Sequence, residues 1–490
     1  MLISGKGFTS KTNGLFFMLK KTFLIIWFFT NLALLAQNNE LTKQIDEILS
    51  DDFFESTNIA IDVYDLTANK TVYRKNEKLL MHPASNMKIL TSVAALLSLD
   101  SSFTFNTSVY YSGLLMESVC YGDLYFVGGC DPDFTSDDLD SLVKSIKEFG
   151  INEIRGNLYG DVSLLDSLFW GNGWMWDDDP STDFPYMTPL IINDAAVKIS
   201  YEPNLIDKPV VVKTIPQSKF FDIENTSVTI KEDTSDLTIT RDWINRENTI
   251  IVKGTLSYKA LPDTTELNLV HPEKYFLTLA EESLKKNGII FDGFVDTATM
   301  PLFTHHIATF ERSLDSVLVN LNKESDNLSA EMLLRAMAYT YFGKPATAEN
   351  GLKLIDSLVN MTGLEPTDYK FADGSGVSRY NLVTAELLLE VLKYIYYNHH
   401  DKYVKLYNSF PIAGVDGTLE NRMTNSTSSG NVHAKTGSLS GVSSLSGYLT
   451  TKNNHQIAFS ILMQNYIESS SVPRLIQDKI CDILTSSIIE

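Results

Sequence analysis

The sequence predicts an α+β protein in which the two ends of the chain build one five-stranded antiparallel sheet and the middle forms separate β-rich modules. Near the N-terminus, two strand-like runs occupy 59–64 and 71–73, and near the C-terminus three more occupy 431–437, 443–450 and 456–464. Helical patterns that can cover both faces of this sheet lie at 40–49, 314–321, 327–340, 348–359, 384–397, 401–408 and 472–488.

The middle of the chain, from about Ser102 to Met300, holds short strand-like runs and only two clear helical patterns, at 139–149 and 275–286. Such a texture is typical of β-rich material inserted into another domain, here one module nested in a second. The expected division is a first part of the sheet domain at 37–101, module II at 102–195 and 262–301, the nested module III at 196–261, and a second part of the sheet domain at 302–490.

The first 36 residues have the pattern of a secretory signal peptide. Lys20 and Lys21 precede an apolar run from Phe23 to Leu35, and Ala36 closes it. The alternative is a membrane anchor, but the run is short for a span. The pattern begins cleanly at Met18, which makes 1–17 a candidate over-extended start. We expect cleavage after Ala36 and export of the mature chain.

Composition excludes several classes of protein. The formal net charge of -21 argues against a nucleic-acid partner, which requires clustered basic residues. Three cysteines are too few for a disulfide framework, and Cys481 is expected to lie buried in a C-terminal helix. The eight histidines are scattered and no His-Glu-x-x-His motif is present, so we predict neither a metal site nor a cofactor.

Ser85 and Lys88 form the first candidate catalytic motif. An apolar helical pattern begins at Ile89, and Pro83 suits the first turn of that helix. A spacing of three places the hydroxyl and the amine on one helix face, as a nucleophile–base pair requires. Alone the motif is weak, because Ser141 and Lys144 share its spacing and read as ordinary helix surface.

Two further motifs follow in the chain. Ser325, Asp326 and Asn327 precede a helix, where Asn327 or the nearby Ser329 could instead be a helix cap. Lys435-Thr436-Gly437-Ser438 closes a strand, where the alternative is a simple glycine turn. In this order the motifs match S-x-x-K, S-D-N and K-T-G, a combination far more specific than any of its parts, and it predicts a serine acyl-transfer site.

The chemistry assigns a role to each side chain. Ser85 attacks a carbonyl, and Lys88 must be neutral to take its proton, a state that burial and the charge of Lys435 both favour. Ser325 can relay the proton to the leaving amine, and Asn327 can hold the substrate amide. A substrate carboxylate and the oxyanion are expected to be bound by the K-T-G strand, through Lys435, Thr436, Gly437 and Ser438, with backbone N–H donors from Ser85 and Ser438.

The chain resembles the type-4 (class C) penicillin-binding proteins, the D-alanyl-D-alanine carboxypeptidase/endopeptidase family. The resemblance covers nearly the whole mature chain and is strongest at 82–97, 122–132, 322–335, 373–381, 411–423 and 434–448. It implies a DD-peptidase/β-lactamase-like domain with two modules inserted after the first motif. Cys130 departs from the family, which commonly has Gly there, and we expect only a local packing change.

The resemblance also implies a substrate contact in module II. The segment 172–179 is similar to the family's Gly-Trp-x-Trp region, where an acid contacts the free amine of the substrate side chain. Asp178 is the best candidate, with Asp177 and Asp179 as rivals, and the alternative is an acidic solvated loop packed by tryptophans. Asp416, Gly417, Thr418 and Arg422 are expected to shape the approach to the cleft, with ordinary turn chemistry as the alternative.

The leading hypothesis is a periplasmic serine-type carboxypeptidase that removes the terminal D-Ala from peptidoglycan stem peptides, with endopeptidase cleavage of cross-links as a further activity. β-Lactam antibiotics are the expected covalent inhibitors. One alternative is a β-lactamase, but no Glu-x-x-Leu-Asn segment follows Asn327 to supply an extra carboxylate. The other is a non-catalytic module that binds or senses peptidoglycan. The sequence makes no prediction of oligomeric state.

Overall fold

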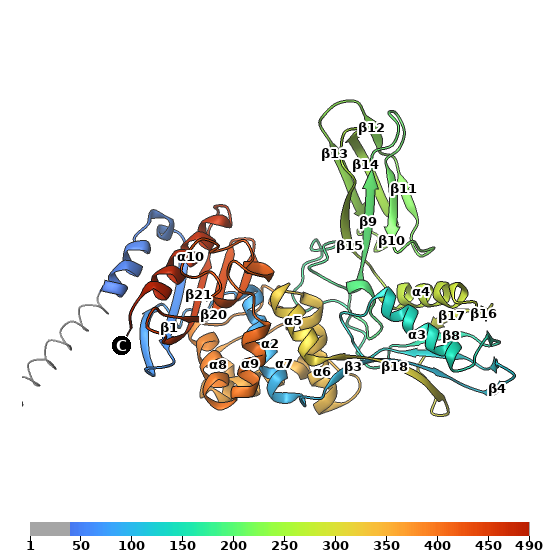
Figure 1. Cartoon of the computed structure of the whole chain (residues 1–490), viewed down its shortest axis with the longest axis horizontal. Coiled ribbons are helices and arrows are strands. Elements are labelled where there is room, and N and C mark those ends of the chain that lie inside the picture. Colours follow the sequence, from blue (N-terminus) through green and yellow to red (C-terminus); the bar gives the residue numbers. More distant parts are fainter. Residues whose placement is uncertain (1–39, 490) are drawn as a thin grey trace, which may run out of the picture.

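The computed structural model describes residues 40–489, so the predicted signal peptide at 1–36 lies outside the described residues. Its central element is a five-stranded antiparallel sheet in the order β19-β20-β21-β1-β2. The strands are β1 (Asn58–Asp65), β2 (Lys70–Lys75), β19 (His433–Leu439), β20 (Val442–Thr450) and β21 (Gln456–Gln464). This confirms the predicted sheet built from both ends of the chain (Figure 1).

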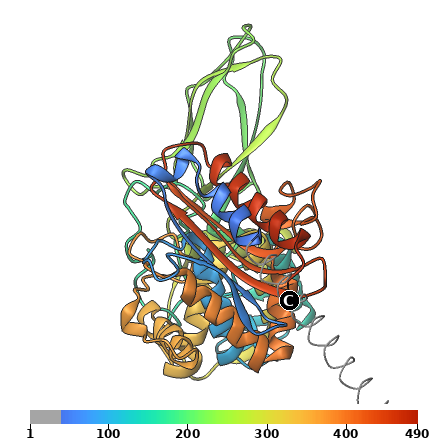
Figure 2. The same cartoon turned by 90° about the vertical axis from the view of Figure 1, so that its left-hand side faces the viewer.

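Each face of this sheet is covered by helices, as predicted. A helix over residues 40–48 and α10 (Ser471–Ser486) lie on one face, as Figure 2 shows. α2 (Met87–Ser98) and α8 (Ala385–Asn398) pack on the other. Side chains alternate along a strand, so Ile59 and Ile61 of β1 pack in the first core, between the sheet and α10. Ala60 packs in the second core, between the sheet and the helices α2 and α8. Cys481 lies buried in α10.

The second core is built around α2. The helices packed in it with α2 and α8 are α5 (Leu314–Lys323), α6 (Asn327–Phe342), α7 (Ala348–Met361) and α9 (His400–Ser409). Helix α2 is buried from Met87 to Leu96, the polar Lys88 included. A helix surrounded on all sides is shielded from water, which places its first turn in a nonpolar environment.

Module II contains two sheets, ordered β17-β8-β6-β3-β18 and β16-β7-β5-β4, with α3 (Ser136–Glu148) and α4 (Pro272–Lys286) packed on them. The strands are β3 (Thr104–Tyr111), β4 (Leu114–Met116), β5 (Val119–Tyr121), β6 (Leu124–Val127), β7 (Glu153–Ile154), β8 (Leu158–Asp161), β16 (Ile290–Phe291), β17 (Val295–Thr297) and β18 (His305–Ser313). β18 pairs with β3 along its length, so the module reaches Ser313 rather than the expected 301. Ser141 and Lys144 lie exposed on α3.

Module III projects from the rest of the molecule (Figure 1) as two small sheets, β10-β9-β15 and β11-β14-β12, the latter with β13 beside β14. Its strands are β9 (Ala196–Glu202), β10 (Val211–Ile215), β11 (Ile223–Asn225), β12 (Val228–Ile230), β13 (Asp236–Arg241), β14 (Ile250–Ser257) and β15 (Asp263–Asn268). β15 pairs with β9, so the module extends to Asn268, beyond the expected 261.

The three cysteines are free and buried. Cys120 lies on β5, and β6 begins at Leu124. Cys130 adopts a φ of 63°, in the left-handed region that favours glycine. This conformation gives a physical reason for the glycine of the resembling family, and it places a strained residue in a buried position.

A long loop, residues 162–192, connects β8 of module II to β9 of module III through a short 3-10 turn at Asn193–Ala195. It contains no helix or regular strand. Loops of this length in compact proteins are uncommon and usually carry function. None of the helices within residues 40–489 has both the length and the apolar character of a membrane span.

Candidate active site

Ser85 lies on a 3-10 turn, Ala84–Asn86, that runs directly into α2. Two strands of the sheet hold this turn in place. Ser444 Oγ donates to the Pro83 carbonyl oxygen at 2.7 Å, and Asn86 Nδ2 donates to the carbonyl oxygen of Lys435 at 2.8 Å. The predicted nucleophile is therefore fixed against β19, which carries the third motif.

Lys88 lies one turn further along α2, fully buried. Its Nζ contacts three oxygens: Ser85 Oγ at 2.9 Å, Asn327 Oδ1 at 2.5 Å and the Ser375 carbonyl at 2.9 Å. The carboxamide and carbonyl oxygens can only accept, so they engage two N–H groups of the amine. In the neutral form the remaining lone pair then points to Ser85, which is the geometry of a general base.

Burial sets the charge of both lysines. It lowers the pKa of Lys88 to about 8, although the carboxylates of Asp326 and Asp373 act in the opposite direction. The pKa of Lys435 is held well below its usual range, first by burial and then by the charge of Lys88. Two amines this close cannot both carry a proton easily, which favours a neutral base near physiological pH.

The acceptor Ser375 belongs to a loop that a buried carboxylate organises. Glu331 on α6 accepts from the backbone N–H groups of Gly374 at 2.8 Å and Ser375 at 2.9 Å. The same side chain pairs with Arg335 at 2.9 Å, and both are buried. Gly376 follows with a φ of 91°, where a Cβ would lie 1.9 Å from the Ala84 carbonyl oxygen. Glu331 thus positions Lys88 through the loop between them.

The second motif forms the link between α5 and α6. Ser325 adopts a φ of 64°, and its hydroxyl makes no hydrogen bond within the described part of the chain. Asp326 is the helix cap and accepts from Ser329 N at 2.5 Å, so neither Asn327 nor Ser329 has the capping role considered above. Asn327, freed from capping, contacts Lys88 through its oxygen and donates through Nδ2 to the Asp183 carbonyl at 2.7 Å.

The third motif runs along β19 beside the nucleophile. A Cβ on Gly437 would lie 2.9 Å from Ser85 N, so glycine is needed for this close approach. Thr436 Oγ1 donates to Thr418 Oγ1 at 2.7 Å. Lys435 points inward instead, fully buried, and donates to the Thr436 carbonyl at 3.1 Å. It therefore lies beneath the floor of the site rather than at its wall.

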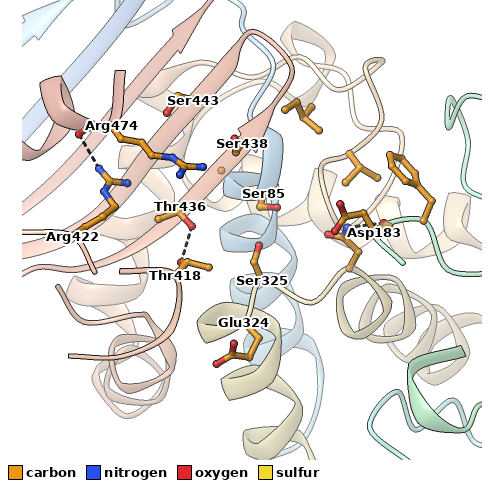
Figure 3. Close-up of a pocket in the computed structure, with 15 residues that line it drawn as sticks. Ser85, Asp183, Glu324, Ser325, Thr418, Arg422, Thr436, Ser438, Ser443 and Arg474 are labelled. Atoms are coloured by element: carbon orange, nitrogen blue, oxygen red, sulfur yellow. Dashed lines mark hydrogen bonds between the residues drawn. The ribbon is translucent and has the colours of Figure 1, made fainter. Parts of the chain in front are cut away.

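One cavity of about 530 Å³ joins the three motifs, as Figure 3 shows. The predicted residues that line it are Ser85, Ser325, Asn327, Thr436, Gly437 and Ser438. Two arginines, Arg422 and Arg474, line the side of β19. Arg422 pairs with Asp478 at 2.6 Å, whereas Arg474 is exposed and forms no salt bridge within residues 40–489. The cavity thus offers hydroxyls and a free cation on one side of the nucleophile.

The three candidate acids of module II lie in different environments. Asp179 is buried in an ion pair with Arg241 of module III, so its carboxylate is already neutralised. Asp178 is half-buried and accepts from Met175 N at 2.7 Å, while Asp177 is exposed. Burial raises the pKa of Asp178, with Asp177 adding to the effect and Arg379 opposing it. None of the three lines the cavity around Ser85.

Asp416 and Gly417, which were predicted to shape the approach to the cleft, hold neighbouring segments of the site in place. Asp416 accepts from Lys323 Nζ at 2.5 Å and Gly417 packs against the Lys323 carbonyl, which fixes Thr418 beside β19. His433 lies on β19 with its ring stacked on Tyr407, at 4.0 Å between centroids. Within residues 40–489 no group of His, Cys, Asp and Glu side chains is arranged to hold a metal ion.

Several residues of the site carried no motif. Asp183 contributes only a backbone oxygen, which any residue could supply, and Phe184 belongs to a segment without a pattern. Arg474 lies in the predicted helix at 472–488, whose pattern does not mark it as a site residue. For Glu331, in contrast, the sequence does contain an indication of burial. A charged residue on a helix whose other positions are apolar is expected to be buried with a partner, and Arg335 follows it by one turn.

This fold and this arrangement of Ser, Lys and Asn define an active-serine domain of the DD-peptidase/β-lactamase type. The chain belongs to the D-Ala-D-Ala carboxypeptidase 3 (S13) family, whose model matches residues 41–487. It is similar to the D-alanyl-D-alanine carboxypeptidase DacB of Haemophilus influenzae, with 30% identity over 84% of this chain and 86% of that protein. It is equally similar to the D-alanyl-D-alanine carboxypeptidase of Actinomadura sp. strain R39, with 30% identity over 91% and 84% of the two chains.

Solved structures agree. Penicillin-binding protein 4 (dacB) of Haemophilus influenzae superposes with a TM-score of 0.79 at 28% identity, over 89% of this chain and 97% of that chain. The same protein complexed with a novel β-lactam superposes with a TM-score of 0.74 at 26% identity, over the same shares of the two chains.

Proposed function

We propose that this chain removes the terminal D-Ala from peptidoglycan stem peptides through an acyl-enzyme on Ser85. The observation that carries the proposal is the contact of 2.9 Å between Lys88 Nζ and Ser85 Oγ, made by a fully buried amine. Membership of the family and the names of its relatives support the same substrate. Cleavage of a cross-link breaks the same kind of bond with a larger leaving amine, so endopeptidase activity belongs to the proposal.

Acylation follows from the geometry. Lys88 takes the proton of the Ser85 hydroxyl while Oγ bonds to the carbonyl carbon of the penultimate D-Ala. The backbone N–H groups of Ser85 and Ser438 receive the oxyanion, each such donor being worth about 3 kcal/mol in the transition state. The proton then passes through the free Ser325 hydroxyl to the leaving amine as the C–N bond breaks. Water hydrolyses the ester and returns the proton.

Binding of the substrate uses the two sides of the cavity. Thr436 and Ser438 present hydroxyls to the terminal carboxylate, and Arg474 supplies the exposed charge that the buried Lys435 does not bring to the wall. Asn327 faces the peptide amide on the other side. Asp178, which does not line the cavity, remains the proposed partner of a free amine on the stem peptide.

A long-lived adduct with penicillins is the second part of the proposal. A β-lactam offers a strained amide to the same nucleophile, and the related penicillin-binding protein 4 has been solved with one. The segment after Asn327 contains no Glu-x-x-Leu-Asn, and its one nearby carboxylate, Glu331, is engaged with Arg335 and the Gly374–Ser375 backbone and does not line the cavity, which disfavours a β-lactamase. Rapid, repeated hydrolysis of penicillin would contradict this part.

Mass spectrometry of purified peptidoglycan after digestion tests the proposal. The wild type is expected to release D-Ala and to shorten pentapeptide stems, whereas Ser85→Ala leaves them intact. Identical products for the two proteins would overturn it. Penicillin bound to Ser85 without any release of D-Ala would instead indicate a module that only binds or senses peptidoglycan.

Export to the periplasm is also proposed. It rests on the signal-like segment at 1–36 and on a substrate that lies outside the cytoplasmic membrane. N-terminal sequencing of the mature protein from a periplasmic extract tests it, with Gln37 as the expected first residue.

A further inference from the structure

Two stacked tryptophans lie where the long loop of module II meets the β13–β14 hairpin of module III. The ring centroids of Trp176 and Trp243 are 5.4 Å apart, with 28° between the ring planes. Trp176 is 73% exposed, and the neighbouring Leu168 and Ile244 are 69% and 74% exposed. We call Trp176, Trp243, Leu168 and Ile244 the aromatic platform. A clustered apolar surface of this kind, rimmed by polar groups, marks a binding site.

The platform rests on a rigid base. Beneath it Arg241 pairs with Asp179 and donates to the carbonyl oxygens of Glu247 and Asn268, each at 3.1 Å. Tyr186 OH donates to the same Asp179 carboxylate at 3.0 Å. Because these groups are buried and fully engaged, the loop and the hairpin are held together and the rings above are pre-organised.

A groove runs along the platform. The tryptophans wall a cavity of about 340 Å³, which shares Ser167, Phe169, Tyr186 and Arg246 with a second cavity of about 380 Å³. Together they form one groove within the size range of small-molecule sites. The cavity beside the tryptophans is lined by five aromatic side chains, and the second cavity adds mainly aliphatic ones. Ser167 and Arg246 supply a hydroxyl and a guanidinium for hydrogen bonds, and Asp166 and Glu273 add carboxylates at the second cavity.

We propose that this groove binds the glycan strand of peptidoglycan. Pyranose rings present apolar C–H faces that stack on the negative face of an aromatic ring, while their hydroxyl and acetamido groups need polar partners at the edge. A pre-organised tryptophan surface with a polar rim meets both needs. The proposal rests on the proposed function, which makes peptidoglycan the substrate.

A row of packed aromatic rings connects the wall of the groove to the wall of the catalytic cavity. Ring contacts link Phe169 to Tyr186 at 5.7 Å, Tyr186 to Trp170 at 4.8 Å, and Trp170 to Phe184 at 6.4 Å. Phe184 lines the cavity of Ser85. One loop therefore carries a saccharide surface at one end and the wall of the peptide site at the other, as a polymer of glycan with peptide branches requires.

Binding of peptide-free glycan strands, prepared by removing the stem peptides with an amidase, tests the inference. The proteins are the full mature chain, Trp243→Ala, Trp176→Ala and the control Phe303→Ala. Phe303 is 90% exposed in module II, outside the groove. By calorimetry, each tryptophan variant is expected to raise Kd about fivefold or more, the range of a lost aromatic stack, and the control to match the wild type.

Two further measurements keep the outcomes separate. Penicillin acylation reports the folded sheet domain in every variant, and a tryptophan variant that fails it is replaced by the other. Release of D-Ala from a soluble pentapeptide by the wild type tests the proposed function alone. If the wild type releases D-Ala but does not bind the strands, or if the tryptophan variants bind them as the wild type does, the inference is overturned. A lower Tm with unchanged Kd would show that the tryptophans only brace the two modules.

Discussion

The catalytic corner of the sheet domain and the aromatic platform of the inserted modules hold their key side chains in opposite ways. In the corner, Lys88 and Lys435 are fully buried and contact carbonyl, carboxamide and hydroxyl oxygens. On the platform, Trp176 is exposed and stacks on the partly buried Trp243, beside a buried ion pair. Burial lowers the pKa of the lysine amines, which suits them to proton transfer. An exposed and rigid surface is suited to binding a ligand.

Two hydrogen bonds join the long loop to residues around Lys88. Trp174 Nε1 donates to Asp373 Oδ2 at 3.0 Å, and Asn327 Nδ2 donates to the Asp183 carbonyl at 2.7 Å. Through them the long loop touches the network around Lys88 without adding a reacting group. We therefore expect changes in the corner to affect every acylation, and changes in the loop to affect only substrates that reach it.

The largest effect is expected for Lys88→Ala. Loss of the general base should slow acylation by penicillin at least about a thousandfold, the upper range for such catalysis. Stopped-flow measurement of acylation checks this. Lys144→Ala is the matched control, since Ser141 and Lys144 have the same spacing on an exposed helix. Equal losses in both variants would contradict the assignment of the buried Lys88 as the general base.

A comparison of Glu331→Gln with Glu349→Gln measures the effect of breaking a buried ion pair against that of breaking an exposed one. Glu331→Gln leaves Arg335 without its partner and should lower the free energy of unfolding by about 3–5 kcal/mol. It should also slow acylation, because the loop that positions Lys88 loses its anchor. Glu349→Gln breaks an exposed pair with Lys353 on α7 and should change neither. Urea unfolding and the rate of acylation are measured for both variants. An unchanged midpoint for Glu331→Gln would contradict the contribution given to the buried ion pair, and an unchanged rate would contradict the role given to the loop.

The pH dependence of acylation follows from Lys88. Burial lowers the pKa of its amine to about 8, so below that pH the base is increasingly protonated. The rate should rise about tenfold per pH unit up to pH 8 and then level off. A profile recorded with penicillin between pH 6 and 9 checks this. A flat profile would exclude Lys88 as the titrating base.

The smallest effects are expected for variants at the proposed contacts with the carboxylate and with the free amine of the substrate. Arg474→Ala should slow acylation by penicillin and raise KM for a pentapeptide, each about fivefold, because both molecules carry a carboxylate. Asp178→Asn should raise KM by a similar factor only for stem peptides with a free amine. Kinetics with amine-bearing and N-acetylated peptides make the comparison. If Asp178→Asn also slows acylation by penicillin, Asp178 contributes to the reaction at Ser85, and its proposed role as a contact for the free amine is contradicted.

The sheet could be predicted from the sequence because its strands are short runs rich in apolar and β-branched residues, separated by short turns. The catalytic motifs could be found because Ser85, Lys88, Asn327 and Gly437 each need one residue type. The module boundaries could not, because β15 and β18 are fixed by pairing with strands far back in the chain, and local pattern does not record such partners.

The residues that surround the catalytic side chains could not be predicted from motifs either. Asp183 acts through its backbone, and Lys435 was expected at the wall, where its charge would meet the substrate. The structure buries it instead, with its amine donating to the Thr436 carbonyl oxygen. Burial on this scale depends on packing between segments far apart in sequence.

Peptide mapping of the penicillin adduct by mass spectrometry tests the central claim most directly. The account predicts one covalent adduct, on the peptide that contains Ser85, stable over the time of the digest and absent from Ser85→Ala. An adduct on another serine, or one that persists when Ser85 is replaced, would contradict it.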